Sequence, residues 1–133
     1  MKTYIERINR VIDFIDNHLA EKLTLNRLAG IAHFSPFHFH RIFRALMHEP
    51  LNKYIQRIRL ERAAMQLTAN PSKSITEVVF NTGFSGSASF ARAFKEHFGV
   101  SASAWRADGK NQESKIRKTI RKNREQMRKM SQT

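Results

Sequence analysis

The 133-residue chain contains no cysteine, and this absence removes several kinds of site at once. Disulfide bonds, zinc sites built from thiolates and cysteine nucleophiles all require that side chain, so none of them is expected. A chain without cysteine also fits a reducing compartment, and we expect a cytoplasmic location.

Long apolar runs are missing as well. The sequence has no stretch of 18 consecutive apolar residues, so no segment is expected to span a bilayer. The N-terminal segment MKTYIERINRVIDFID carries acidic side chains and lacks a continuous apolar core, which distinguishes it from a signal peptide. We therefore expect no membrane partner.

Acidic residues are scarce: 11 Asp and Glu stand against 24 Lys and Arg, which gives a net charge of +13. Such a positive field attracts polyanions, with nucleic acid as the first candidate and an anionic membrane surface as the second. Residues 1–106 hold 15 basic and 8 acidic residues, a net of +7, and residues 107–133 hold 9 and 3, a net of +6. This shift in composition marks the end of a domain near residue 106.

The acidic residues form no catalytic pattern. They are scattered, without an HExxH, a DxDxDG or a paired-carboxylate arrangement, so we expect no enzyme and no cofactor. Four histidines do cluster, namely His33, His38, His40 and His48. On a helix His38 and His40 would point about 200° apart, and the i,i+4 pairing of zinc-binding helices is absent, so we expect no metal site.

Apolar residues recur at three- and four-residue spacing through residues 1–106, which indicates helices and no strand. The predicted fold class is all-α, with seven helices. Thr24, Ser35 and Ser74 are suited to cap helix starts, and Gly83 is suited to a left-handed turn. The expected inward-facing residues of four of these helices are Leu25, Leu28, Ala29, Ala32, Phe39, Ile42, Phe43, Leu46, Ile75, Val78, Val79, Phe90, Phe94 and Phe98.

Two segments repeat one pattern of a small-residue helix, a turn with serine and a phenylalanine-rich helix. They read LNRLAGIAHFSPFHFHRIFRALM at residues 25–47 and ITEVVFNTGFSGSASFARAFKEHF at residues 75–98. The pattern is typical of helix-turn-helix units, which place their second helix in the major groove of DNA. We predict one domain over residues 1–106, with two helix-turn-helix subdomains at about 3–49 and 70–106 joined by a long linker helix over about 51–69.

The second helix of each unit needs one face in the core and another face free to reach base edges. Arg41 can donate two hydrogen bonds to guanine, and Arg92 is the main expected base reader of the second unit. The full set expected to contact bases is Phe37, His40, Arg41, Ser87, Ala88, Ser89, Ala91 and Arg92. The set expected to contact the DNA backbone is Ser35, His38, Arg44, Lys95 and Arg106.

A non-specific basic nucleic-acid-binding protein is the main alternative, because one exposed basic helix face is more often only solvated. The pairing of two such helices favours sequence-specific binding to double-stranded DNA, for which a monomer suffices. The linker helix would span about 28 Å at 1.5 Å per residue, less than the ~34 Å between successive major-groove faces. We therefore expect the DNA to bend toward the protein.

Over about residues 4–106 the chain resembles the DNA-binding domain of the AraC/XylS family of bacterial transcription regulators, with the layout of the MarA and SoxS activators. The resemblance rests on RIRLERAAMQL at residues 57–67, TGFSGSASFARAFKEHFGVS at residues 82–101, and Trp105-Arg106. It implies seven helices, two recognition helices in successive major grooves, promoter binding, and activation through contact with RNA polymerase. The alkyl-acceptor activity of some relatives requires a reactive cysteine, so it is excluded for this sequence.

Several positions depart from the family pattern. His33 and His48 stand where the family often has glycine, so we expect positive φ with some strain at both turns. Ala102 stands where proline is usual. The second recognition helix is poor in long polar side chains, so the first unit is expected to carry more of the base specificity.

The basic segment 107–133 has few apolar residues, and we expect a solvated, frayed helix or a disordered arm. Two functional alternatives remain open at this point. One is added non-specific attraction to phosphate, and the other is a linker to an effector domain beyond Thr133.

Overall fold

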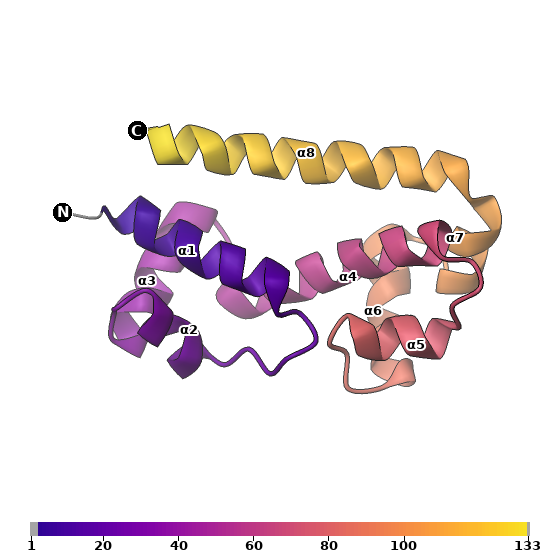
Figure 1. Ribbon diagram of the computed structural model, residues 1–133, viewed down its shortest axis with the longest axis horizontal. Coiled ribbons are helices and arrows are strands. Elements are labelled where there is room, and N and C mark those ends of the chain that lie inside the picture. Colours follow the sequence, from indigo (N-terminus) through magenta and orange to yellow (C-terminus); the bar gives the residue numbers. More distant parts are fainter. Residues whose placement is uncertain (1–2, 133) are drawn as a thin grey trace. The chain divides into compact units, whose positions relative to one another are not determined.

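The computed structural model describes residues 3–132, with the side chains of residues 110–116, 127 and 130–132 outside that description. The described residues form eight helices and no strand (Figure 1). The helices are α1 (Tyr4–Asn17), α2 (Leu25–Ile31), α3 (Pro36–Met47), α4 (Leu51–Ala69), α5 (Ile75–Asn81), α6 (Ser87–Phe98), α7 (Ala102–Asp108) and α8 (Lys110–Gln132). The all-α prediction is confirmed, and α8 is added to the seven helices that were expected.

The chain divides into two compact units. Unit 1 comprises residues 1–57 with 124–133, and unit 2 comprises residues 58–123. The division falls inside α4, whose bounds match the linker helix expected over about 51–69. Its first residues complete the core of unit 1, and its remaining residues begin unit 2.

The core of unit 1 forms where the apolar face of α1 packs against α2 and α3. The α1 residues Ile8, Val11, Ile12 and Ile15 are buried at helical spacing. On α3 the buried ring of Phe43 meets the edge of Tyr54 from α4, with ring centroids 5.5 Å apart. This edge-to-face contact fixes the start of α4 against the first helix-turn-helix.

The core of unit 2 repeats this arrangement with different residues. Phe90 and Phe94 of α6 are buried, and the ring of Trp105 from α7 stands edge-on to Phe94 at 5.7 Å between centroids. The indole N–H of Trp105 donates to the carbonyl oxygen of Ala64 on α4, at 3.0 Å. A buried indole needs such a partner, so this bond fixes α7 against α4.

Local sequence signals define where the helices begin. The hydroxyl groups of Thr24, Ser35 and Ser74 each accept the backbone N–H three residues later, at 3.1–3.2 Å, which confirms the predicted caps. The predicted left-handed backbone of Gly83 is confirmed at φ 94°. Leu25 was expected in the core but is 37% exposed, because it is the first residue of α2 and lies at the edge of the packed face.

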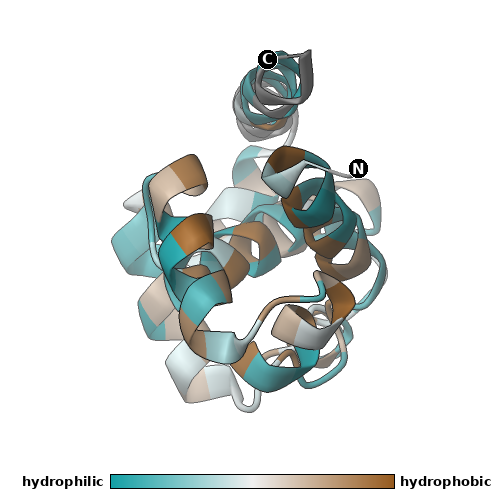
Figure 2. Ribbon diagram, turned by 90° about the vertical axis from the view of Figure 1, so that its left-hand side faces the viewer, coloured by the Kyte–Doolittle hydropathy of each residue, from teal (hydrophilic) through white to brown (hydrophobic). Residues whose placement is uncertain are grey.

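The basic segment after residue 109 forms the 23-residue helix α8, where a frayed helix or a disordered arm was expected. Ile120 is half-buried against the core of unit 2, which gives this part of the helix an anchor. The other described residues of α8 are mostly hydrophilic (Figure 2). Among the described helices, none combines the length and the apolar character that a bilayer span requires.

Candidate nucleic-acid interface

Each unit contains one helix-turn-helix, formed by α2 and α3 in unit 1 and by α5 and α6 in unit 2. The first helix has 7 residues in both copies and the second has 12. Both second helices end at a left-handed residue, His48 at φ 61° and Gly99 at φ 79°. The N–H of each donates to a carbonyl four residues earlier, so the repeat holds at the level of the backbone.

The two turns also match in their hydrogen bonds. In unit 1 the N–H of Phe34 donates to the carbonyl oxygen of Ala29 at 3.0 Å, and in unit 2 the N–H of Phe84 donates to Val79 at 3.1 Å. His33 at φ 59° occupies the place that Gly83 has in unit 2, which confirms the positive φ expected at His33 and His48. The second connection, residues 82–86, is one residue longer than the first, residues 32–35.

The outer face of α3 is open to solvent. Phe39 and Phe43 fill the core, whereas Phe37 is 72% exposed and His40, Arg41 and Arg44 are also exposed. The guanidinium carbon of Arg41 lies 5.8 Å from the centroid of the Phe37 ring, one turn away on the same helix. The aromatic ring therefore supports the side chain expected to read bases.

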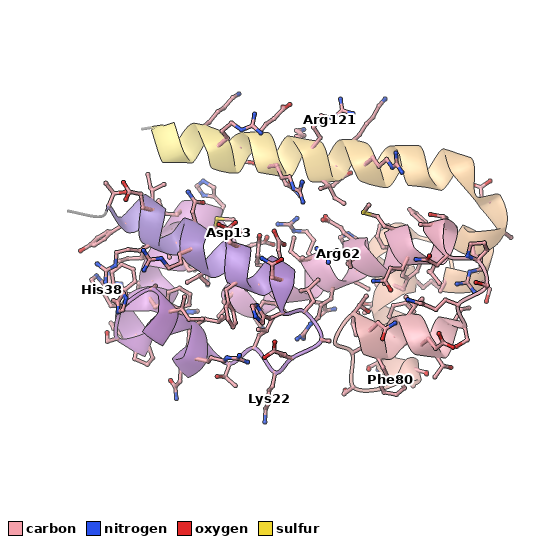
Figure 3. All side chains as sticks on the ribbon, in the orientation of Figure 1. Asp13, Lys22, His38, Arg62, Phe80 and Arg121 are labelled. Carbon is pink, nitrogen blue, oxygen red and sulfur yellow. The ribbon has the colours of Figure 1, made fainter. Side chains whose placement is uncertain are left out.

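The first turn of α3 is occupied by aromatic contacts. The exposed ring of His38 stands edge-on to Phe34 at 5.1 Å and to Tyr4 of α1 at 5.8 Å between centroids. Figure 3 shows His38 near the end of unit 1 where α1 begins. The hydroxyl oxygen of Ser35 accepts a hydrogen bond from the backbone N–H of His38 at 3.2 Å. The expected contact of Ser35 with phosphate would therefore use the proton of the same hydroxyl group.

The outer face of α6 is exposed as well, but it differs in chemistry. The six expected contact residues of this helix are all exposed: Ser87, Ala88, Ser89, Ala91, Arg92 and Lys95. The hydroxyl of Ser89 donates to the carbonyl oxygen of Gly86 at 3.1 Å, which leaves its oxygen as an acceptor. Short side chains on this face permit a close approach of the helix backbone.

The N-terminus of α6 has no side-chain cap within the described residues. Its N-cap position is Gly86, which has extended backbone at φ −165°, whereas Ser35 caps α3. The first N–H groups of α6 thus remain open to an anion such as phosphate. The sequence assigned Ser87 to base contact, and the part that Gly86 plays in leaving this end open is visible only in the folded chain.

The guanidinium of Arg106 forms hydrogen bonds within unit 2. It was expected to contact the DNA backbone, but its Nε–H donates to the carbonyl oxygen of Leu67 at 2.9 Å and its Nη2 group donates to that of Lys73 at 2.7 Å. These carbonyls lie at the end of α4 and in the loop that follows. Because the guanidinium is half-buried and engaged, Arg106 fits a clamp within unit 2 better than a phosphate contact.

The basic side chains on the two recognition faces are not neutralised. Within the described residues, Arg41, Arg44, Arg92 and Lys95 form no ion pair. Ion pairs form elsewhere: Arg57 binds Glu49 at 2.7 Å, and Arg27 binds Glu21 at 2.8 Å. The hydrogen bond from Arg27 holds the pKa of the exposed Glu21 carboxyl below its usual value. No described group of three or more His, Cys, Asp and Glu residues could hold a metal ion.

Comparison with known proteins gives concordant matches. A family model described as a helix-turn-helix domain matches residues 28–108. The Bacillus subtilis (strain 168) bifunctional transcriptional activator/DNA repair enzyme AdaA is 32% identical over 109 residues, which are 82% of this chain and 51% of AdaA. The chain therefore spans about half the length of that relative.

Two solved structures share the arrangement. The DNA-binding domain of AdpA, a global transcriptional factor in complex with a target DNA, matches with a TM-score of 0.72 and 26% identity over 77% of this chain and 91% of that one. A Chromobacterium violaceum transcriptional regulator, described among AraC-type DNA-binding domain-containing proteins, matches with a TM-score of 0.71 and 25% identity over 76% and 89%.

Proposed function

Because the chain belongs to the AraC-type helix-turn-helix family of DNA-binding transcription regulators, we propose that it binds specific sequences in double-stranded promoter DNA and regulates transcription there. The observation that carries this proposal is the pair of recognition helices, each with a buried phenylalanine stripe and an unneutralised basic outer face. In the proposed complex α3 and α6 enter successive major grooves of one duplex.

In this proposal the two recognition helices make different contacts with the DNA. On α3, Phe37, His40 and Arg41 contact base edges, with Ser35, His38 and Arg44 toward the backbone. On α6, Arg92 is the main base reader, and the small residues Ser87, Ala88, Ser89 and Ala91 let the helix approach closely. The open N-terminus of α6 and Lys95 then contact phosphate, so α3 supplies more of the sequence discrimination.

The proposal also covers the oligomeric state, the location and the protein partner of the chain. A single chain carries both recognition helices, so a monomer suffices, and it acts in the cytoplasm at the nucleoid. We propose that it activates transcription through contact with RNA polymerase, in line with the description of AdaA as an activator. We propose that the chain requires no cofactor and has no enzymatic activity, although AdaA is also described as a DNA repair enzyme.

Selection of bound duplexes from a random library tests the proposal directly. We expect enrichment of one site with two conserved parts about one helical turn apart, roughly 10 base pairs from centre to centre. Recovery of unbiased sequence after repeated rounds would instead establish the alternative, a non-specific basic nucleic-acid-binding protein. That alternative has its own support in the exposed basic side chains of α8.

A further inference from the structure

One side chain of α1 holds the whole turn of the first helix-turn-helix. The Nε–H of Arg7 donates to the carbonyl oxygen of Ala32 at 2.6 Å, and its Nη2 group donates to that of His33. Its guanidinium carbon lies 3.7 Å from the centroid of the Phe34 ring. Three consecutive residues of the turn are thus bound by one planar group from another helix, and Arg7 lies outside the region that the family model matches.

The turn that Arg7 holds is the strained one. His33 has φ 59°, a left-handed conformation that is unfavourable for a residue with a side chain, whereas unit 2 has Gly83 at φ 94° in the same place. In the described part of unit 2, no arginine donates to the carbonyls of Thr82, Gly83 or Phe84, and the Thr82 hydroxyl bonds to Val78 within α5. Arg7 therefore holds the turn in which His33, and not glycine, has the left-handed conformation.

We propose that Arg7 is a positioning residue for base reading by α3, an inference that rests on the proposed function. It holds His33 in the left-handed conformation and so fixes the direction in which α3 leaves the turn. Tyr4 extends this support, because its ring stands edge-on to Phe34 at 5.2 Å and to His38 of α3 at 5.8 Å. Without the clamp, His33 relaxes toward negative φ, and the outer face of α3 no longer matches the base edges.

The test uses the duplex that the wild-type chain selects from random DNA, together with its single-base variants. Positions read by α3 and by α6 are first assigned with Arg41→Ala and Arg92→Ala. For Arg7→Ala, we expect the roughly tenfold or larger penalty of a mismatch to fall below about threefold at positions read by α3 and to stay unchanged at positions read by α6. The matched control is Arg10→Ala, which removes the same charge from the next turn of α1 and leaves both sets of penalties intact.

Two further variants separate positioning from direct contact. Arg7→Lys keeps the charge but cannot span two carbonyls with a planar fork, so it should lose discrimination as Arg7→Ala does. Adding His33→Gly to Arg7→Ala should restore discrimination at the α3 positions, because glycine keeps the left-handed turn without a clamp. Thermal unfolding of each variant, followed by circular dichroism, identifies any that is unfolded, and Arg7→Lys replaces Arg7→Ala in that case.

Several outcomes would overturn the inference. Unchanged discrimination in Arg7→Ala and Arg7→Lys would do so, as would a selective loss that His33→Gly does not restore. A uniform loss over all sequences, with the log–log salt slope reduced by about 0.9, would show that Arg7 contacts phosphate instead. A wild-type chain that selects no sequence would contradict the proposed function itself, which is distinct from a failure confined to Arg7.

Discussion

At the scale of single residues, Arg41 and Arg92 occupy equivalent, exposed places on α3 and α6. We predict that Arg41→Ala or Arg92→Ala costs about 1–3 kcal/mol of binding free energy and relaxes discrimination at one base position. The reason is that a guanidinium reads guanine with two hydrogen bonds that alanine cannot replace. Affinities for the selected duplex and its single-base variants measure both effects.

Lys95→Ala provides the contrast for these two variants, because a phosphate contact carries no sequence information. It should weaken binding to all duplexes by a similar factor. If Arg41→Ala or Arg92→Ala showed the same uniform loss, that arginine would be a phosphate contact and not a base reader.

Single residues also show what could and could not be predicted from the sequence. The outward faces of α3 and α6 follow from helical periodicity, since Phe39, Phe43, Phe90 and Phe94 define the buried side. The clamps made by Arg7 and Arg106 do not, because the carbonyls they bind lie 25 and 39 residues away along the chain. Arg106 was accordingly assigned to phosphate from its type and place alone.

At the scale of helices, the open start of α6 makes a specific prediction. Gly86 has extended backbone, and a Cβ added there would meet no atom within 4 Å, so a larger residue fits. We predict that Gly86→Asn and Gly86→Asp cap α6 and stabilise the fold by a few tenths of a kcal/mol or less. Both should bind the selected duplex more weakly, since the side chain takes the N–H groups that would hold phosphate.

The pair of variants also controls for charge. Asparagine blocks the N–H groups without adding a charge, whereas aspartate also repels phosphate and should reduce affinity further. Equal affinities of wild type and both variants, with unfolding temperatures raised by the new cap, would show that the start of α6 does not approach the DNA backbone.

The starts of three helices could be derived from local signals, and α8 shows the limit of that approach. Thr24, Ser35 and Ser74 are at the positions that the caps predicted. The few apolar residues of α8 predicted a frayed helix or a disordered arm, and the structure has a helix there. Ile120 supplies part of the answer, because its partner surface is the core of unit 2, which the sequence of α8 alone does not reveal.

All seven basic side chains described on α8 are exposed: Arg117, Lys118, Arg121, Lys122, Arg124, Arg128 and Lys129. Figure 3 shows Arg121 projecting outward from the helix. A deletion of α8 should begin at Lys110, because Ala107 and Asp108 belong to α7. We predict that the deletion flattens the salt dependence of binding, by about 0.9 in log–log slope for each phosphate that α8 neutralises, and leaves sequence preference unchanged.

The control for this deletion is Lys22→Gln with Lys53→Gln, compared with Lys118→Gln with Lys122→Gln in the intact chain; all four lysines lie on the surface. The pair on α8 should change the slope more than the pair in unit 1. A deletion that altered which sequences are selected would mean that α8 reads bases.

At the scale of the whole molecule, the continuous helix α4 is the basis for a prediction about DNA shape. Its 19 residues span about 28 Å, whereas successive major-groove faces of straight DNA lie about 34 Å apart. We predict that the chain bends the selected duplex, which a circular-permutation gel shift measures as position-dependent mobility. The Arg92→Ala variant is the control, because weaker engagement of α6 should reduce the bend. Uniform mobility with both recognition helices engaged would contradict the bend.

The whole-molecule account could be derived from the sequence in outline. Two similar segments and a large positive charge predicted a double helix-turn-helix, and the family match agrees. The helix α4 contributes to both cores, since Tyr54 packs in unit 1 and Leu67 in unit 2. Which of its residues belong to which core follows only from the packing of the folded chain.

The central claim, sequence-specific reading by two helices, is tested most directly by the ratio of two affinities across a salt series. Binding of the intact chain to the selected duplex and to a scrambled duplex of equal length should weaken together as salt rises. We predict a ratio of roughly 10³ or more at physiological salt. A ratio near one at every salt concentration would contradict the account and leave a protein that binds nucleic acid through charge alone.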